Sequence, residues 1–231
     1  MTRTRRTAAA LTTLAVSVLG LAVTAAPAEA APPVTTPDAT SMYAGNARDV
    51  DVLANDTDAD PDGAEDLAVC RMGDESYRRV FAESMGDGVV FVYSLPSAKP
   101  GTYTFTYYAC DFQTLVPGTI TVTIDAEPEV TAKALPGQPG KIKVTNPADF
   151  KIKFLYGSFK EANPDGTVKI AKGSSVILTV QRTQIDWIAY TRKNEFLKQG
   201  RVKNIVLPPG TTPPAAGRFG PRIQKIWASG V

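Results

Sequence analysis

Four aspartates at alternate positions form the segment of the chain whose residue types best suit metal chemistry. They are Asp56, Asp58, Asp60 and Asp62. This spacing resembles the start of a calcium loop, because Ca²⁺ takes roughly six to eight oxygen ligands from a loop that folds around it. Pro61 stands where the EF-hand pattern requires glycine. The segment therefore predicts either a weak extracellular calcium site or an acidic, solvated turn, which Asp, Pro and Gly favour on conformational grounds.

The residues that most enzymes use for nucleophilic or metal catalysis are scarce. The chain has no histidine and two cysteines, Cys70 and Cys110. This composition excludes Ser-His-Asp and Cys-His catalysis, zinc or haem bound through histidine, and a thiolate metal cluster. Two carboxylates that hydrolyse a glycosidic bond must face each other across a sugar-binding cleft, which local clustering of Asp does not indicate. We therefore expect a protein that is not an enzyme.

Basic side chains alternate with apolar ones in the C-terminal half, as at Lys151 and Lys153. Residues 127–207 carry 14 basic and seven acidic side chains, whereas residues 34–126 carry five basic and 15 acidic ones. The other basic residues of this half include Lys141, Lys143, Lys160, Lys169, Lys172, Arg182, Arg192, Lys193, Lys198, Arg201 and Lys203. Such a face attracts anionic polymers or membranes. The alternatives are docking on the acidic half, or a solvated surface whose lysines discourage edge-to-edge strand pairing.

Aromatic residues of the same half form a second candidate binding site. Trp187 and Tyr190, with Tyr156 and Phe159, would give an aromatic platform for sugars if their rings were exposed. The alternative places these rings in the hydrophobic core, where aromatic side chains of a small β-sandwich are more often found. Sugar binding that is insensitive to salt and lost on Trp187→Ala would support the platform.

Residues 1–30 have the three parts of a secretory signal peptide. Arg3, Arg5 and Arg6 precede an uncharged run over residues 8–26, and Ala28-Glu29-Ala30 is a small-x-small cleavage signature. The alternative is an uncleaved membrane anchor, but the run is rich in Ala and Thr and barely long enough to span a bilayer. We expect cleavage near Ala30, bacterial-type export to the extracellular space, no membrane span in the mature chain, and no nucleic-acid partner.

Alternation of β-branched or aromatic residues with polar ones runs through the remaining chain. Residues 102–108 read TYTFTYY and residues 119–124 read TITVTI, with turn signals such as Asp87-Gly88 between the segments. This pattern predicts an all-β chain of two tandem Ig-like β-sandwich domains. We expect a Pro/Thr-rich linker over residues 31–41, sandwiches over 42–125 and 130–207, a joint over 126–129, and a Pro/Gly-rich basic tail over 208–231. Residues 195–200 predict a turn.

Several motifs of the first half occur in a characteristic order. Residues 51–58 read DVLANDTD, residues 66–69 read DLAV, residues 87–93 read DGVVFVY, and residues 101–107 read GTYTFTY. Over residues 50–124 the chain resembles bacterial cadherin-like, Ig-type repeats. The resemblance implies an Ig-like sandwich used in extracellular adhesion and surface architecture, without catalytic residues. Here the Asp-rich turn is longer than in that family, and the two cysteines are an addition.

In an oxidising compartment the two cysteines most simply form one disulfide. If Val69 and Ala109 face the core, Cys70 and Cys110 face outward, because successive side chains of a strand point to opposite sides. In the fold that the resemblance implies, these two strands are neighbours in one sheet. We therefore expect a cross-strand disulfide on the outer surface of that sheet; the alternative is two free thiols.

These patterns predict a secreted, non-catalytic protein that acts as a binding protein or a structural spacer at the outer face of a cell. The first domain is an Ig-like module that tolerates or binds calcium. The second domain contacts an anionic wall polymer or another protein through its cationic surface. The alternative function is that of a carbohydrate-binding module that uses the aromatic residues of the second domain.

Overall fold

The computed structural model describes residues 31–59, 67–111, 114–212 and 214. Within these residues the chain forms β-strands and no α-helix, so the prediction of an all-β fold is confirmed. None of these residues belongs to an apolar helix that could span a bilayer. The predicted signal peptide over residues 1–30, Asp60 and Asp62 of the acidic segment, and most of the tail lie outside the described residues.

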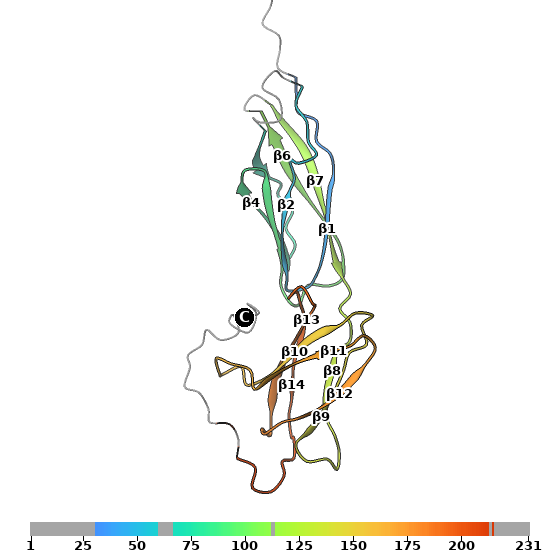
Figure 1. Ribbon diagram of the computed structural model, residues 1–231. Coiled ribbons are helices and arrows are strands. Elements are labelled where there is room, and N and C mark those ends of the chain that lie inside the picture. The colour runs from blue at the N-terminus through green and yellow to red at the C-terminus, as the bar shows by residue number, and fades with distance from the viewer. Residues whose placement is uncertain (1–30, 60–66, 112–113, 213, 215–231) are drawn as a thin grey trace, which may run out of the picture. The chain divides into compact units, whose positions relative to one another are not determined.

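The first β-sandwich pairs a four-stranded with a three-stranded sheet (Figure 1). The larger sheet has the order β1 (Asp38–Tyr43), β7 (Leu115–Asp125), β6 (Gly101–Cys110) and β3 (Ala68–Met72). The smaller sheet has the order β2 (Ala47–Asp51), β5 (Val89–Ser94) and β4 (Val80–Gly86). Strands β1 and β7 are parallel, and the other neighbours are antiparallel.

The core of the first sandwich follows the alternation in the sequence. Val89, Phe91 and Tyr93 of β5 are half-buried on the outer face, whereas Val90 and Val92 are fully buried. They pack against inward residues of the larger sheet, among them Phe105, Tyr107, Ala109, Ile120, Val122 and Ile124. Residues 38–41, expected in the linker, belong to β1, because backbone pairing with β7 and burial of Met42 extend this strand toward the N-terminus.

The second β-sandwich also pairs a four-stranded with a three-stranded sheet (Figure 1). The larger has the order β11 (Gly166–Ile170), β10 (Ile152–Gly157), β13 (Ile185–Tyr190) and β14 (Phe196–Val202). The smaller has the order β12 (Ser175–Thr179), β9 (Lys141–Thr145) and β8 (Thr131–Ala134). The turn expected over residues 195–200 is wrong: residues 196–200 lie in β14, because pairing with the buried strand β13 outweighs the low intrinsic strand preference of Lys198 and Gly200.

Three glycines stand directly opposite aromatic rings in the two sandwiches. The cross-strand pairs are Tyr107–Gly118, Tyr156–Gly166 and Trp187–Gly200. A Cβ atom at each glycine would overlap the ring of its partner. Each ring therefore lies over the glycine backbone of the next strand, an arrangement that covers the glycine and holds the ring in place.

The disulfide joins Cys70 of β3 to Cys110 of β6, whose Cα atoms are 6.0 Å apart. The predicted cross-strand bond between neighbours of one sheet is therefore confirmed. The expectation that both cysteines lie on the outer surface is wrong for Cys110, which is 2% exposed, whereas Cys70 is exposed. The difference arises because Cys110 has a paired strand on each side, while Cys70 lies on edge strand β3 beside a register shift.

Candidate functional site

Asp56, the first residue of the acidic segment, is buried in the first sandwich. Its Oδ1 accepts a hydrogen bond from the Thr36 N–H at 2.7 Å, and its Oδ2 accepts one from the Tyr107 hydroxyl at 2.9 Å. The Tyr107 hydroxyl also lies 3.1 Å from the carbonyl oxygen of Val52. Burial and the neighbouring Asp56 carboxylate raise the pKa of the Tyr107 hydroxyl. Both oxygens of Asp56 are thus engaged inside the domain, where they fix the segment before β1.

The calcium site predicted from Asp56, Asp58, Asp60 and Asp62 has two members among the described residues. Asp56 does not suit a cation ligand here, because it is buried and its two oxygens accept protein hydrogen bonds. In the described part of the chain, no three Asp, Glu, Cys or His side chains lie close enough together to hold a metal ion. Calcium binding by the acidic turn stays a prediction.

Asp38 at the start of β1 lies beside the same buried hydrogen bonds. Burial, and then repulsion from the carboxylates of Asp56 and Asp51, raise the pKa of Asp38. Its Oδ2 is buried and accepts no hydrogen bond from a described residue. A carboxyl with a raised pKa in the folded state holds its proton more tightly there, so folding stability falls as pH rises through that pKa.

We expect Asp38→Asn to raise the urea midpoint of the first sandwich at pH 7, because the amide carries no charge. The gain should disappear near about pH 3, below the ordinary carboxyl pKa, where Asp38 itself is protonated. Urea unfolding at the two pH values measures this difference, with Asp49→Asn at an exposed position as the matched control. A lowered midpoint at pH 7, or the same shift at both pH values, would contradict the argument.

Four basic side chains of the second sandwich surround one hollow of about 320 Å³. We call Lys151, Lys153, Lys169 and Arg192 the cationic site. Lys151 immediately precedes β10, Lys153 lies in β10, Lys169 lies in β11, and Arg192 lies in the turn between β13 and β14. Ile152 and Asn194 complete the lining, so the hollow has no carboxylate among its lining residues.

The register of the sheet concentrates positive charge at the cationic site. Lys153 is directly opposite Lys169 in the β10–β11 ladder, and like charges in such pairs are destabilising. No member of the site forms an ion pair with a described residue. By contrast, Arg182 pairs with two carboxylates, those of Glu161 and Asp165. The positive charge of the cationic site is therefore not neutralised by an ion pair within the described part of the chain.

A tight turn presents Arg192 to the hollow. The Thr191 N–H donates to the carbonyl oxygen of Glu195 at 2.9 Å, and the Asn194 N–H donates to that of Thr191 at 3.1 Å. Asn194 takes a left-handed conformation with φ of 64°, which asparagine tolerates better than most residues. A second hollow of about 430 Å³ shares Lys151 and Arg192, and its lining also includes Lys193 and the acidic Glu195.

Trp187 and Tyr190, the predicted aromatic platform, are buried on opposite faces of β13. Trp187 is 5% exposed in the inner core, where its ring stacks on Phe154 with centroids 5.3 Å apart. Tyr190 is 2% exposed on the outer face, where it packs with Leu155, Ile188 and the partly buried Phe196. Burial raises the pKa of Tyr190 to about 12. Neither ring presents a face to a sugar in this structure, and both lie in packed hydrophobic clusters.

The basic residues of the second half, predicted to share one face, are divided between the two sheets of the second sandwich. Lys141 and Lys143 lie in β9, in the other sheet from the cationic site, which is built on β10 and β11. Their alternation with buried Ile142 and Val144 indicates that each lysine points outward. Alternation along one strand shows which side chains point outward, but it does not show which sheet the strand belongs to. The sequence pattern alone therefore could not separate these lysines from the cationic site.

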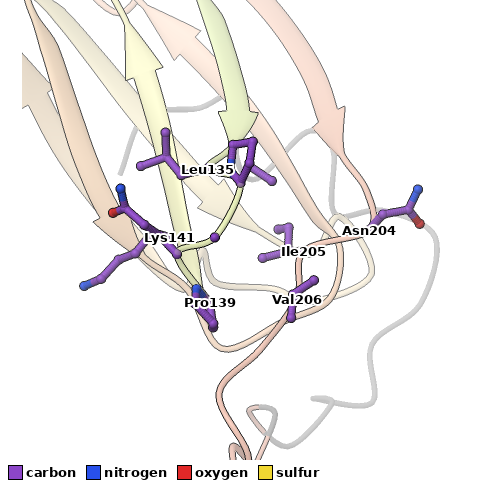
Figure 2. A pocket seen from close by; sticks show the side chains of 10 residues that line it. Leu135, Pro139, Lys141, Asn204, Ile205 and Val206 are labelled. Atoms are coloured by element: carbon purple, nitrogen blue, oxygen red, sulfur yellow. The ribbon is translucent and has the colours of Figure 1, made fainter.

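A third hollow, of about 390 Å³, lies between the β8–β9 turn and residues 204–206. Figure 2 shows side chains of the turn on one side and those of residues 204–206 on the other. The lining is mainly apolar, and Lys141 is its one charged residue. These lining residues include no carboxylate, cysteine or histidine, so the hollow offers none of the side chains that most often bind metal ions.

Residues 30–125 match the family model described as a bacterial Ig domain. The first sandwich is a bacterial Ig domain. The match confirms the resemblance seen over residues 50–124 and extends it to the N-terminal side of β1. The second sandwich lies outside the matched residues. No curated protein matches the chain.

Solved structures similar to the chain include Ig-type and cadherin-type proteins. The titin I-band fragment I67–I69 is 12% identical with a TM-score of 0.31, over 76% of this chain and 66% of that one. The human desmocollin-1 ectodomain is 12% identical with a TM-score of 0.29, over 80% of this chain and 39% of that one. An endo-fucoidan hydrolase of glycoside hydrolase family 107 is 10% identical with a TM-score of 0.30, over 75% of this chain and 34% of that one. The chain thus spans well under half of the desmocollin and hydrolase chains, and similarity at this level does not assign an activity.

Proposed function

We propose that this is an exported, non-catalytic protein whose second sandwich binds an anionic polymer of the cell exterior at the cationic site. The bacterial Ig domain then acts as the structural module that accompanies this binding surface. The observation that carries the proposal is the convergence of four basic side chains on one hollow without an ion pair to a described residue.

The electrostatics of the cationic site suit a repeating anionic ligand. Lys153 and Lys169 face the same solvent as direct cross-strand neighbours, and Lys151 precedes Lys153 by two residues along the same edge of the hollow. A polymer with regularly spaced phosphate, sulfate or carboxylate groups relieves the repulsion within this cluster by placing negative charge between the lysines. The positive field of the second half also raises the local concentration of such a ligand.

Export and the absence of catalysis rest on the sequence and the family. Residues 1–30 have the composition of a signal peptide, and bacterial Ig domains are binding and structural modules rather than catalysts. The chain has no histidine, which removes the base that Ser-His-Asp and Cys-His catalysis require. Binding rather than turnover is therefore the function that these features support.

The double substitution Lys153→Glu/Lys169→Glu should lower affinity for a polyanion at least tenfold. Dextran sulfate is the anionic probe and unmodified dextran the neutral one, with binding measured by co-sedimentation or calorimetry. Binding of the unaltered protein should weaken strongly as ionic strength rises toward 0.15 M, where the screening length falls to about 8 Å. Both lysines lie on the outer side of their strands, so the variant should keep its fold.

The matched control is Lys141→Glu/Lys143→Glu, which makes the same change of charge on the other sheet. This variant should keep most of the affinity for dextran sulfate. Equal losses in the two variants would mean that net charge alone attracts the polymer, and would contradict a defined site. Binding to unmodified dextran that salt does not weaken would favour a carbohydrate-binding module instead.

A further inference from the structure

The outer face of the small sheet in the Ig domain carries aromatic rings between carboxylates. We call this surface the acidic aromatic face: Asp49 and Asp51 of β2, Phe91 and Tyr93 of β5, and Phe81 and Glu83 of β4. Alternate residues of the same strands, such as Val90 and Val92, fill the core. The rings of the acidic aromatic face are therefore additional to those that hold the sandwich together.

The rings of this face are stacked on one another along the surface. Phe81 and Tyr93 have centroids 4.9 Å apart, and Phe91 and Tyr93 have centroids 5.5 Å apart. The Tyr93 hydroxyl donates to Glu83 at 2.9 Å, which fixes the Tyr93 ring. Preordered, half-buried aromatic side chains are typical anchors of protein–protein interfaces, because little conformational entropy is lost when they are covered.

The carboxylates of the acidic aromatic face lie beside these rings. In the ladder, Asp49 and Glu83 flank Phe91 on its two sides, and Asp51 is opposite Val89. None of the three carboxylates forms an ion pair with a residue in the part of the chain that the structure describes. A partner for this face must therefore bring both apolar area and positive charge.

The small sheet of the second sandwich has the complementary outer surface. We call Lys133 of β8, Lys141 and Lys143 of β9, and Ile177 of β12 the lysine face. The register places Lys143 between Lys133 and Ile177 in one row across the sheet. Ile177 is 56% exposed, which leaves an apolar side chain uncovered beside the lysines.

We propose that the acidic aromatic face of one copy packs on the lysine face of a second copy. Asp49 and Asp51 are two residues apart on one strand, and so are Lys141 and Lys143. Both pairs thus present charges spaced by about 7 Å, since a strand rises about 3.4 Å per residue. Packing of the two sheet faces would place Ile177 against the aromatic rings and the lysines against the carboxylates, in the manner of aligned sheets.

The two surfaces are different, so the contact is heterologous. Repetition of such a contact produces a closed ring if its rotation closes, and an open chain of molecules if it does not. This inference does not depend on polymer binding, because the lysine face contains neither Lys153 nor Lys169 of the cationic site. It adds a partner of defined chemistry: another copy of the same protein.

Sedimentation velocity of two charge-reversed variants tests the contact. One variant is Asp49→Lys/Asp51→Lys, and the other is Lys141→Glu/Lys143→Glu. The unaltered exported protein should show a mass that grows with concentration at low ionic strength and falls toward the monomer near 0.15 M salt, as screening shortens to about 8 Å. Each variant alone should remain monomeric, because its two faces now carry charge of the same sign.

Mixing the two variants should restore a complex, since each variant then meets a face of opposite charge. All substituted residues point to solvent, and the recovery on mixing shows that both variants are folded. A monomer at every concentration for the unaltered protein, a complex formed by either variant alone, or no recovery on mixing would each overturn the proposal. Lys153→Glu/Lys169→Glu should associate like the unaltered protein even where it no longer binds dextran sulfate, so the two proposals fail separately.

Discussion

Asn146→Ala is expected to lower the free energy of unfolding of the second sandwich by about 3–5 kcal/mol, since each buried backbone group left without a partner costs about 1–3 kcal/mol. Asn146 is fully buried. Its Nδ2 donates to the carbonyl oxygens of Phe150 and Ala171, both at 2.9 Å. Its Oδ1 accepts from the Ala148 N–H at 3.0 Å. One amide side chain therefore satisfies backbone groups of the segment before β10 and of the turn after β11.

Urea unfolding followed by tryptophan fluorescence measures this loss, because Trp187 lies in the hydrophobic core of the second sandwich. Thr167→Ala, on the exposed face of β11, is the matched control and should change stability by less than about 0.5 kcal/mol. A loss below about 1 kcal/mol for Asn146→Ala would show that water satisfies the freed backbone groups, and would contradict the structural role of the amide.

Removal of the disulfide should have the second large effect, this time on the Ig domain. Cys70 and Cys110 are 40 residues apart in the sequence. Closing a loop of this length stabilises a fold by about 3–4 kcal/mol, chiefly by restricting the unfolded chain. Cys70→Ser/Cys110→Ala should therefore lower the free energy of unfolding of the first sandwich by about this amount. Alanine suits position 110 because Cys110 is buried, whereas serine suits the exposed position 70.

Reduction of the unaltered protein provides the control for this variant. Dithiothreitol should lower the urea midpoint of the unaltered Ig domain to about that of the variant, and should leave the variant unchanged. The unfolding of the second sandwich should not respond to dithiothreitol, because both cysteines of the chain lie in the Ig domain. If dithiothreitol did not change the urea midpoint of the Ig domain, the disulfide would contribute little to its stability.

The fold class could be predicted from the sequence because alternation of side chains directly reports which residues of a strand are inside. Val90 and Val92, or Ile142 and Val144, are buried as their alternation indicates. The boundaries of strands were less predictable, since partners far away in the sequence decide them. Residues 196–200 form a strand because β13 pairs with them, and residues 38–41 do so because of β7.

The sequence predicted that the candidate site is cationic, but it did not predict which basic side chains come together to form it. Lys151 and Lys153 could be identified by alternation, but their grouping with Lys169 depends on the β10–β11 register. The buried role of Asp56 depends on Thr36 and Tyr107, which approach it only in the folded chain. Cross-strand neighbours and long-range hydrogen bonds are properties of tertiary structure, so composition and spacing do not contain them.

Chemical-shift mapping of the isotope-labelled protein with dextran sulfate tests the central claim most directly, because it locates the binding surface residue by residue. We predict that the largest amide shifts fall around the cationic site, at residues 151–153, 169 and 192–194, and that unmodified dextran causes none. Amide shifts spread evenly over the basic surface would contradict binding at the cationic site. So would shifts concentrated on the lysine face with none at the cationic site.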